Sequence, residues 1–200
     1  MAKTYTSKQI HLKGVRLSYP SLFKTEVYNG TDTENYATTF LIPKSDKKLK
    51  KEIDEAIKAL LEEARVKVPS DKICIKDGDD SEADGYADNW TIKASKKKKQ
   101  GRVKLINRHG SKVTVDLDGK IITQDNDGNV TDDKTNEDEF YQGCYVYGII
   151  TFWLQDNSFG KRVNANLLAI KFVKDGERLK GGGGSAEDFD EDFQMEDDDL

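Results

Sequence analysis

The sequence predicts a mainly β fold, a small Greek-key barrel that carries one amphipathic helix and ends in a disordered acidic tail. Short segments with alternating apolar and polar residues recur along the chain, and such alternation is typical of half-buried strands. One segment instead repeats its apolar residues with the period of a helix. A glycine-rich stretch then separates these elements from a strongly acidic end, so residues 1–180 are expected to fold as one domain and residues 181–200 are not.

Strands are expected where apolar residues alternate or cluster between turn-forming residues. Trp90, Ile92 and Ala94, for example, alternate with polar side chains. The 141–154 segment is apolar on both sides, which is typical of a buried central strand or of a strand with one core face and one functional face. Five or more strands with one helix between the early ones favour a small Greek-key barrel. The expected strands are 9–19, 35–44, 90–95, 103–106, 113–117, 141–154 and 163–173, with exposed acidic loops at 77–84 and 125–138.

The helix is expected over about residues 46–66. Ser45 or Asp46 is placed to cap its N-terminus, and Pro69 follows its end. We expect its apolar stripe to pack on the sheet, and we assign the helix no chemistry. The stripe consists of Leu49, Ile53, Ala56, Ile57, Leu60, Leu61 and Ala64.

The charge of the chain is unevenly distributed. The net charge is −5, yet nine of the 37 acidic residues lie in 181–200, where there is no lysine or arginine. Residues 1–180 therefore carry 28 acids against 32 bases. A basic body attracts polyanions, and an acidic tail imitates one. The alternative interpretation of the tail, which stays open, is a solubilising end that binds nothing.

Several classes of protein are excluded by what the sequence lacks. No apolar run approaches the roughly 20 residues of a membrane helix, and the first residues do not resemble a secretion signal. Cys74 and Cys144 form no CxxC pair, so reduced thiols in a cytoplasm are expected rather than a disulfide or zinc framework. Only His11 and His109 are present, and no GxSxG, HExxH or GxxxxGK[ST] motif occurs. We expect no enzyme, no metal and no cofactor.

Basic and aromatic residues gather in the middle of the chain. Residues 85–115 hold nine lysines and arginines but only one acid, Asp88, and Tyr86 and Trp90 adjoin them. Cationic groups neutralise phosphates and release counterions, and flat rings accept unstacked bases. A second turn of this kind, with Phe159 and two bases, precedes the last strand. This mixture is typical of a nucleic-acid groove, although a solvated hairpin tip is the structural alternative.

Six short motifs, in order, resemble a phage and prophage family of single-stranded DNA-binding proteins. The motifs are VRLSYPSLF at 15–23, FLIPK at 40–44, IKDG at 75–78, IKA at 92–94, FYQGCYV at 140–146 and FVKDGE at 172–177. The resemblance covers residues 10–180. It implies an OB-fold barrel that coats single-stranded DNA during phage replication or recombination, inside the bacterial host cell. It also implies an acidic C-terminal tail, although here the chain ends in Leu200 rather than in an aromatic residue.

We therefore expect a sequence-independent single-stranded DNA-binding protein whose acidic tail competes for the DNA groove and recruits replication proteins. The expected phosphate contacts are Lys44, Lys93, Lys96, Lys97, Lys98, Lys99, Arg102, Lys161 and Arg162. The expected stacking rings are Tyr36, Tyr86 and Trp90, although Tyr36 and Trp90 also fit a core position. The expected partner-binding residues of the tail are Phe189, Phe193 and Leu200.

Two alternative functions stay open at this point. One is a metal-dependent nuclease or recombination enzyme, for which the chain offers no convincing set of carboxylates. Another is a protein-interaction module whose tail mimics DNA. The oligomeric state is also open between a monomer and a homodimer, with Tyr145, Tyr147 and Trp153 available for a subunit contact.

Overall fold

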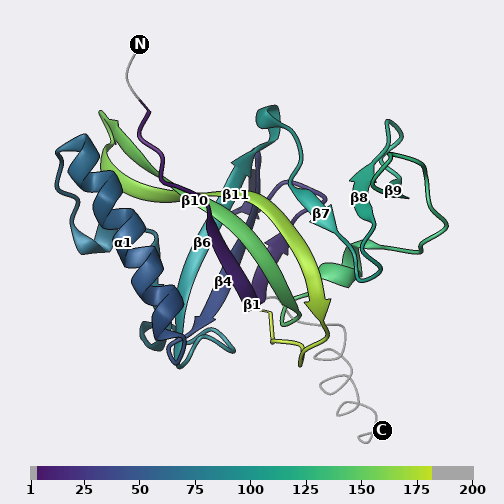
Figure 1. Ribbon diagram of the computed structural model, residues 1–200, viewed down its shortest axis with the longest axis horizontal. Coiled ribbons are helices and arrows are strands. Elements are labelled where there is room, and N and C mark those ends of the chain that lie inside the picture. Colours follow the sequence, from purple (N-terminus) through teal and green to yellow (C-terminus); the bar gives the residue numbers. More distant parts are fainter. Residues whose placement is uncertain (1–3, 182–200) are drawn as a thin grey trace, which may run out of the picture.

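A closed five-stranded barrel forms the centre of the molecule in the computed structural model, which describes residues 4–181 (Figure 1). Its strands are β1 (Ile10–Ser21), β4 (Asn35–Pro43), β6 (Asn89–Lys97), β10 (Tyr145–Asn157) and β11 (Gly160–Lys174). Around the barrel the order is β6-β4-β1-β10-β11, and β11 pairs with β6 to close it. All pairs are antiparallel except β6–β11. The predicted mainly β barrel with one helix is confirmed.

The barrel encloses the apolar side of each strand. Phe40 and Ile92 are fully buried in β4 and β6, and Phe152 is fully buried in β10. Gly148 of β10 lets the Phe40 ring approach, because a Cβ at this glycine would lie only 2.6 Å from the ring. The outward side chains of the same strands are polar or half-buried, as expected when successive residues point to opposite faces.

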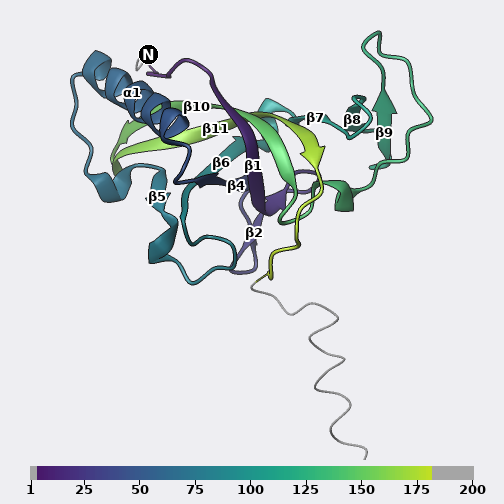
Figure 2. The same cartoon turned by 60° about the horizontal axis from the view of Figure 1, so that its bottom comes forward.

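The single helix, α1 (Lys47–Ala64), lies along one side of the barrel (Figures 1 and 2). Asp46 caps it by accepting a hydrogen bond from the Leu49 amide, and Arg65 ends it in a left-handed conformation. The predicted stripe is the buried face, with Ile53 at its centre. The helix is confirmed to within two residues at each end.

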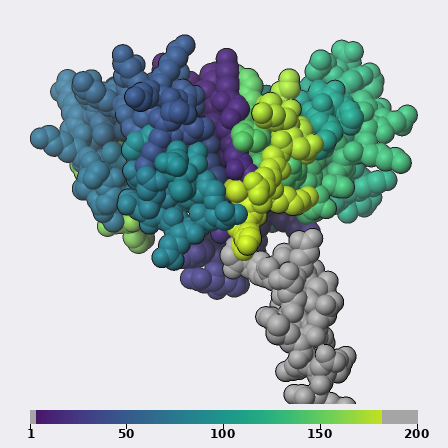
Figure 3. All heavy atoms as spheres, turned by 90° about the horizontal axis from the view of Figure 1, so that it is seen from below, coloured from purple at the N-terminus to yellow at the C-terminus, as the bar shows by residue number. Residues whose placement is uncertain are grey.

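Smaller elements extend the barrel beyond the predicted strands. A β2–β3 hairpin projects from the β1–β4 connection, β5 pairs with β6 at Trp90–Ile92, and β7–β9 form a side lobe that begins on β11. This lobe stands opposite α1, and the C-terminal part of β11 runs at the surface between them (Figure 3). The bounds are β2 (Val27–Tyr28), β3 (Thr31–Asp32), β5 (Ile75–Asp77), β7 (Lys104–Ile106), β8 (Lys112–Val115) and β9 (Ile121–Gln124), with 3-10 turns η1 (Ser70–Lys72), η2 (Gly78–Asp80), η3 (Lys98–Gln100) and η4 (Glu137–Phe140).

Within residues 4–181, no helix is long and apolar enough to cross a membrane. The predicted acidic tail, with Phe189, Phe193 and Leu200, lies outside the described residues apart from Gly181.

Candidate nucleic-acid interface

The outward side of β6 is basic because its residues alternate. Ile92 and Ala94 are fully buried in the barrel, while Lys93 and Lys97 point outward and are exposed. Ser95 lies between these two lysines on the same side of the strand. The alternation that builds the core therefore also places two ammonium groups on one outer surface.

A groove of about 560 Å³ crosses this outer surface. Three lysines line it, namely Lys76, Lys93 and Lys97, together with the rings of Tyr86 and Trp153. The remaining lining residues are neutral: Asn35, Thr39, Cys74, Thr91, Ser95, Gln155, Asn164 and Ala165. No aspartate or glutamate lines the groove. The surface thus combines cations for phosphates with rings for bases, and strands β4, β5, β6, β10 and β11 all contribute to it.

One carboxylate lies close to the groove lysines. Glu26, in the β1–β4 connection, accepts a hydrogen bond from the Lys93 ammonium at 2.5 Å. The Glu26 side chain is 21% exposed and that of Lys93 is 54% exposed. By contrast, none of the ion pairs within residues 4–181 involves Lys76 or Lys97. The charge of Lys93 is therefore partly neutralised when the groove is empty of a polyanion.

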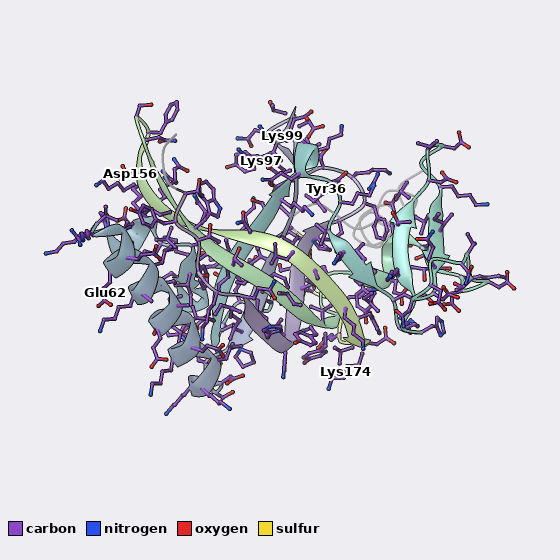
Figure 4. All side chains as sticks on the ribbon, turned by 45° about the horizontal axis from the view of Figure 1, so that its top comes forward. Tyr36, Glu62, Lys97, Lys99, Asp156 and Lys174 are labelled. Carbon is purple, nitrogen blue, oxygen red and sulfur yellow. The ribbon has the colours of Figure 1, made fainter. Side chains whose placement is uncertain are left out.

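Two loops that connect barrel strands carry exposed aromatic side chains. Tyr28, on the β2–β3 hairpin, is 65% exposed, and Phe159, in the β10–β11 turn, is 85% exposed. In small barrels of this topology, the loop between the first two strands and the loop between the last two flank the oligonucleotide-binding face. In Figure 4, Asp156 at the β10–β11 end and Lys97 and Lys99 at the β6 end lie on the same side of the molecule. Exposed rings at both positions fit contacts with bases.

Several of the predicted phosphate contacts lie at the C-terminal end of β6 or at the start of β11. Lys97 ends β6, and Lys98 and Lys99 follow it in η3, where all three are exposed. Lys161 and Arg162 begin β11 beside Phe159, and both are exposed. Lys161 pairs with Asp156 at 3.4 Å across the hairpin. These five cations are accessible, but only Lys97 lines the groove itself.

Three other predicted residues form a structural cluster instead. Tyr36 is only 4% exposed, and the Arg102 guanidinium lies 5.5 Å from its ring centroid. Arg102 donates to the Phe23 carbonyl at 2.9 Å, and the Lys96 ammonium donates to the Arg102 carbonyl at 2.8 Å. Because Tyr36 and Lys96 share the inward side of their strands, the Tyr36 ring has no face open to a base. The core position that the sequence left open for Tyr36 is the one observed.

Lys44 and Trp90 lie together beside α1, away from the groove. Two ammonium groups lie near the Trp90 ring, with Lys44 Nζ at 5.1 Å and Lys50 Nζ at 4.6 Å from the centroid. Lys44 also bridges Asp77, at 2.5 Å, and Asp79. These contacts raise the pKa of Lys44 and lower the pKa values of both aspartates. Lys44 is thus held by two carboxylates, and neither it nor Trp90 lines the groove.

Sequence reasoning misses two residues that do line the groove. It places Trp153 on a strand with one possible functional face and names it for a subunit contact, but does not count it among the stacking rings. Trp153 alternates with buried Phe152 and Leu154, so it points outward. Lys76 lies in the three-residue strand β5, which the sequence does not predict. The signal for Trp153 is present in the alternation, whereas Lys76 depends on the pairing of β5 with β6.

Reactive and metal-binding chemistry has little support in the described part of the chain. Among residues 4–181, no group of three or more histidine, cysteine, aspartate or glutamate side chains is arranged to hold a metal ion. Burial raises the pKa of the Cys74 and Cys144 thiols to about 12, so neither is an activated nucleophile. The Asp125 carboxylate, in the acidic loop after β9, accepts hydrogen bonds from its own loop at Asp127 and Asn129.

Comparisons with known proteins agree with the geometry of this surface. Residues 8–200 match a family profile described as the ssDNA-binding protein of Enterobacter phage Enc34. The chain is 34% identical over 204 residues to protein p50 of Acyrthosiphon pisum secondary endosymbiont phage 1, covering 96% of this chain and 98% of that protein.

Two solved structures of the Enc34 protein resemble the fold. The single-stranded DNA-binding protein from bacteriophage Enc34 matches with a TM-score of 0.68 and 28% identity, covering 94% of this chain and 99% of that chain. Its complex with ssDNA matches with a TM-score of 0.67 and 29% identity, over 85% and 88% of the two chains. These relatives are described as binding proteins and not as enzymes, in agreement with the expectation from the sequence.

Proposed function

This chain belongs to the family of the single-stranded DNA-binding protein of Enterobacter phage Enc34, and from this premise we propose that it binds single-stranded DNA in the groove across β4, β6, β10 and β11. The observation that supports this location is the lining of the groove, with three lysines, two aromatic rings and no carboxylate. A relative with the same fold is described in complex with ssDNA.

Different groove residues contact the sugar-phosphate backbone and the bases of the DNA. Lys76, Lys93 and Lys97 neutralise phosphates, and each contact releases condensed counterions. Tyr86 and Trp153 stack on unpaired bases, with each stack worth about 1–3 kcal/mol. Because every base has a flat face, such stacking tolerates any sequence. Binding is therefore an equilibrium in which no covalent bond forms or breaks.

In the infected bacterial cytoplasm, we propose that the protein coats and protects single-stranded DNA during phage replication or recombination. This role follows from sequence-tolerant binding, because a coating protein must accept whatever strand is exposed. The exposed cations at the end of β6, Lys97 to Lys99, and at the start of β11, Lys161 with Arg162, offer further phosphate contacts to a longer strand.

A titration with labelled oligothymidylate and with duplex DNA of equal length tests the proposed groove. We expect the single strand to bind more tightly, with affinity falling on a log–log salt plot by about 0.7 per phosphate contact. The double variant Lys93→Gln/Lys97→Gln should weaken single-strand binding and lower the salt slope by about 1.4. Lys120→Gln/Lys134→Gln is the matched control. It removes two exposed lysines, one between β8 and β9 and one after β9, and neither lines the groove. Equal losses in the two variants would remove the groove from consideration.

We also propose that the acidic tail competes with DNA for the groove and, once displaced, recruits replication proteins through Phe189, Phe193 and Leu200. The support is the separation of charge along the sequence, with nine acids and no base in residues 181–200. A tether keeps the tail at a high local concentration, so even weak binding to the basic surface is effective. Deleting residues 186–200 should tighten single-strand binding at low salt, and the gain should shrink as salt screens the tail. An unchanged affinity at low salt would count against this competition.

A further inference from the structure

A second basic and aromatic surface lies outside the groove, on the outer side of β1, β10 and β11. We call it the tyrosine ladder, and it consists of Lys13, Arg16, Tyr145, Tyr147, Lys171 and Lys174. None of these residues lines the groove described above. Each tyrosine lies half-buried on the central strand, with one cation on each neighbouring strand.

The register of the three strands creates this arrangement in two rows. Tyr147 is opposite Lys13 on β1 and Lys171 on β11. Tyr145 is opposite Arg16 on β1 and Lys174 on β11. Side chains directly opposite one another in a sheet lie about 4.5–5.5 Å apart at Cβ, which is close enough for contact.

Two β-bulges make the rows possible. The tyrosines are two residues apart, whereas their cationic partners are three residues apart on both flanking strands. Without a bulge, residues three apart would point to opposite faces of the sheet. The register shifts between Lys13 and Val15, where Gly14 has a φ of +65°, and again between Tyr145 and Val146 in the pairing with β11. Both flanking strands therefore deviate from regular pairing at the place where this brings four cations to one face.

Three of the four ladder cations contact rings or carbonyls rather than acids. Lys13 Nζ lies 5.8 Å from the Tyr147 centroid, and Lys174 Nζ lies 4.7 Å from that of Tyr145. The Arg16 guanidinium donates to the Gly143 and Glu177 carbonyls and lies 5.5 Å from the Tyr145 centroid. None of the ion pairs within residues 4–181 includes a ladder residue. Their charge is thus available to a polyanion, and a lysine held only by a weak cation–π contact can move aside for a base.

The ladder continues the outward row of the groove. Tyr145, Tyr147 and Trp153 alternate with buried residues along β10, so they share one side of the strand. Six to eight residues separate Trp153 from the two tyrosines, a distance of roughly 20–27 Å along a strand. Lys174 and Asp156 mark the two ends of this path in Figure 4.

We propose that the tyrosine ladder is a second contact site for single-stranded DNA, which a strand reaches after it leaves the groove along β10. This proposal rests on the proposed function. Phosphates would contact the four cations, and unstacked bases would lie against Tyr145 and Tyr147. Because the two sites are far apart, a short oligonucleotide fills the groove alone and a longer one engages both.

The test compares two lengths of oligothymidylate on the full chain, about 8 and about 30 nucleotides, which bracket the usual site sizes of one such barrel. The variant Lys171→Gln/Lys174→Gln should bind the longer strand on the order of tenfold more weakly at 0.1 M salt, with a salt slope lower by about 1.4. Its affinity for the short strand should be unchanged. The matched control, Lys120→Gln/Lys134→Gln, has the same net charge and should behave as wild type with both lengths.

A second readout locates the contact directly. A 30-nucleotide strand carrying 5-iodouracil should cross-link on irradiation to the peptide containing Tyr145 or Tyr147, and the short strand should not. The proposal is overturned if the ladder variant binds the longer strand as the control does, or more tightly, as expected if the acidic tail occupies the ladder. If wild type binds neither length, the proposed function itself fails.

Discussion

At the scale of single residues, Glu26 limits how much positive charge the groove presents. Its carboxylate holds the Lys93 ammonium at 2.5 Å, beside a groove that no acid lines. DNA must separate this pair, or share Lys93 with it, before a phosphate gains the full charge. We therefore expect Glu26→Gln to tighten single-strand binding about two- to fivefold at low salt, with the gain fading at high salt. Fluorescence titration at two salt concentrations measures both effects.

The matched control for this prediction is Glu62→Gln, which removes an exposed carboxylate that pairs with Lys58 on α1 at 3.8 Å. It changes the net charge equally but leaves the groove untouched. Since Lys93 is more than half exposed, loss of its ion pair should cost less than about 1 kcal/mol of folding stability. Equal gains in affinity from the two variants would mean that only the overall charge matters.

Some residues of the groove were predictable from the sequence. Others were not, because their position depends on strand alternation and on contacts between distant segments. Counting charges along the chain groups Lys96 with Lys97, yet strand alternation turns Lys96 inward and Lys97 outward. Trp90 and Tyr36 are the residue types that stack on bases, but side chains from distant segments contact both rings. Lys50 of α1 lies over Trp90, and Arg102 lies over Tyr36. Local sequence patterns carry no information on such contacts between distant segments.

At the scale of elements, β10 depends on the missing side chain of Gly148. A Cβ there would lie 2.6 and 2.7 Å from two atoms of the Phe40 ring. Both residues are buried. We expect Gly148→Ala to lower the free energy of unfolding by about 1–3 kcal/mol, the usual cost of overpacking a core. Urea denaturation followed by tryptophan fluorescence measures this loss.

The second variant in this experiment is Phe40→Leu, which makes room for the added methyl group. The double variant Gly148→Ala/Phe40→Leu should lose less stability than the sum of the two single losses, because the two side chains would otherwise occupy the same space. Additive losses would show that the Gly148→Ala effect arises elsewhere in β10. Gly119→Ala would report backbone strain alone, because Gly119 is exposed, has a φ of +81° and has no atom within 4 Å of where a Cβ would lie.

The main elements were predictable because each buries one face. The stripe of α1 and the alternation in β6 identify a helix and a strand from local spacing. The parallel pairing of β6 with β11, which closes the barrel, joins Ala94 to Ala165 across about 70 residues of chain, and no local pattern encodes it. The strands β5 and β9 were not predicted, although β7 and β8, which are equally short, were. Alternation over three or four residues is therefore not enough by itself to separate a strand from a loop.

At the scale of the whole molecule, hydrogen-bonded aspartates connect stability to pH. Six described aspartates have a pKa below the ordinary value, chiefly because of hydrogen bonds to their carboxylates: Asp32, Asp77, Asp79, Asp125, Asp133 and Asp175. A lowered folded-state pKa means that the stabilisation is present above the unfolded-state pKa, about 3.9, and is lost as pH falls through the folded-state value. The melting temperature should thus be nearly constant from about pH 8 to 5 and should fall steeply below about pH 4.

Asp175 offers the sharpest test of this linkage, because it joins the barrel to the side lobe. Its carboxylate accepts hydrogen bonds from Arg108 at 3.3 Å and from the Tyr141 hydroxyl at 3.0 Å. Arg108 also contacts Glu139 and packs over the Phe172 ring, so one carboxylate fixes several elements.

The variant Asp175→Asn should have a lower melting temperature than wild type at pH 7. Its melting temperature should then fall less than that of wild type on acidification to pH 4, because the asparagine takes up no proton. Asp116→Asn is the comparison, because the pKa of Asp175 is lowered by a cation whereas Asp116 caps only its own turn at Asp118 and Lys120. Parallel melting curves for wild type and Asp175→Asn across this pH range would show that acid unfolding begins at other carboxylates.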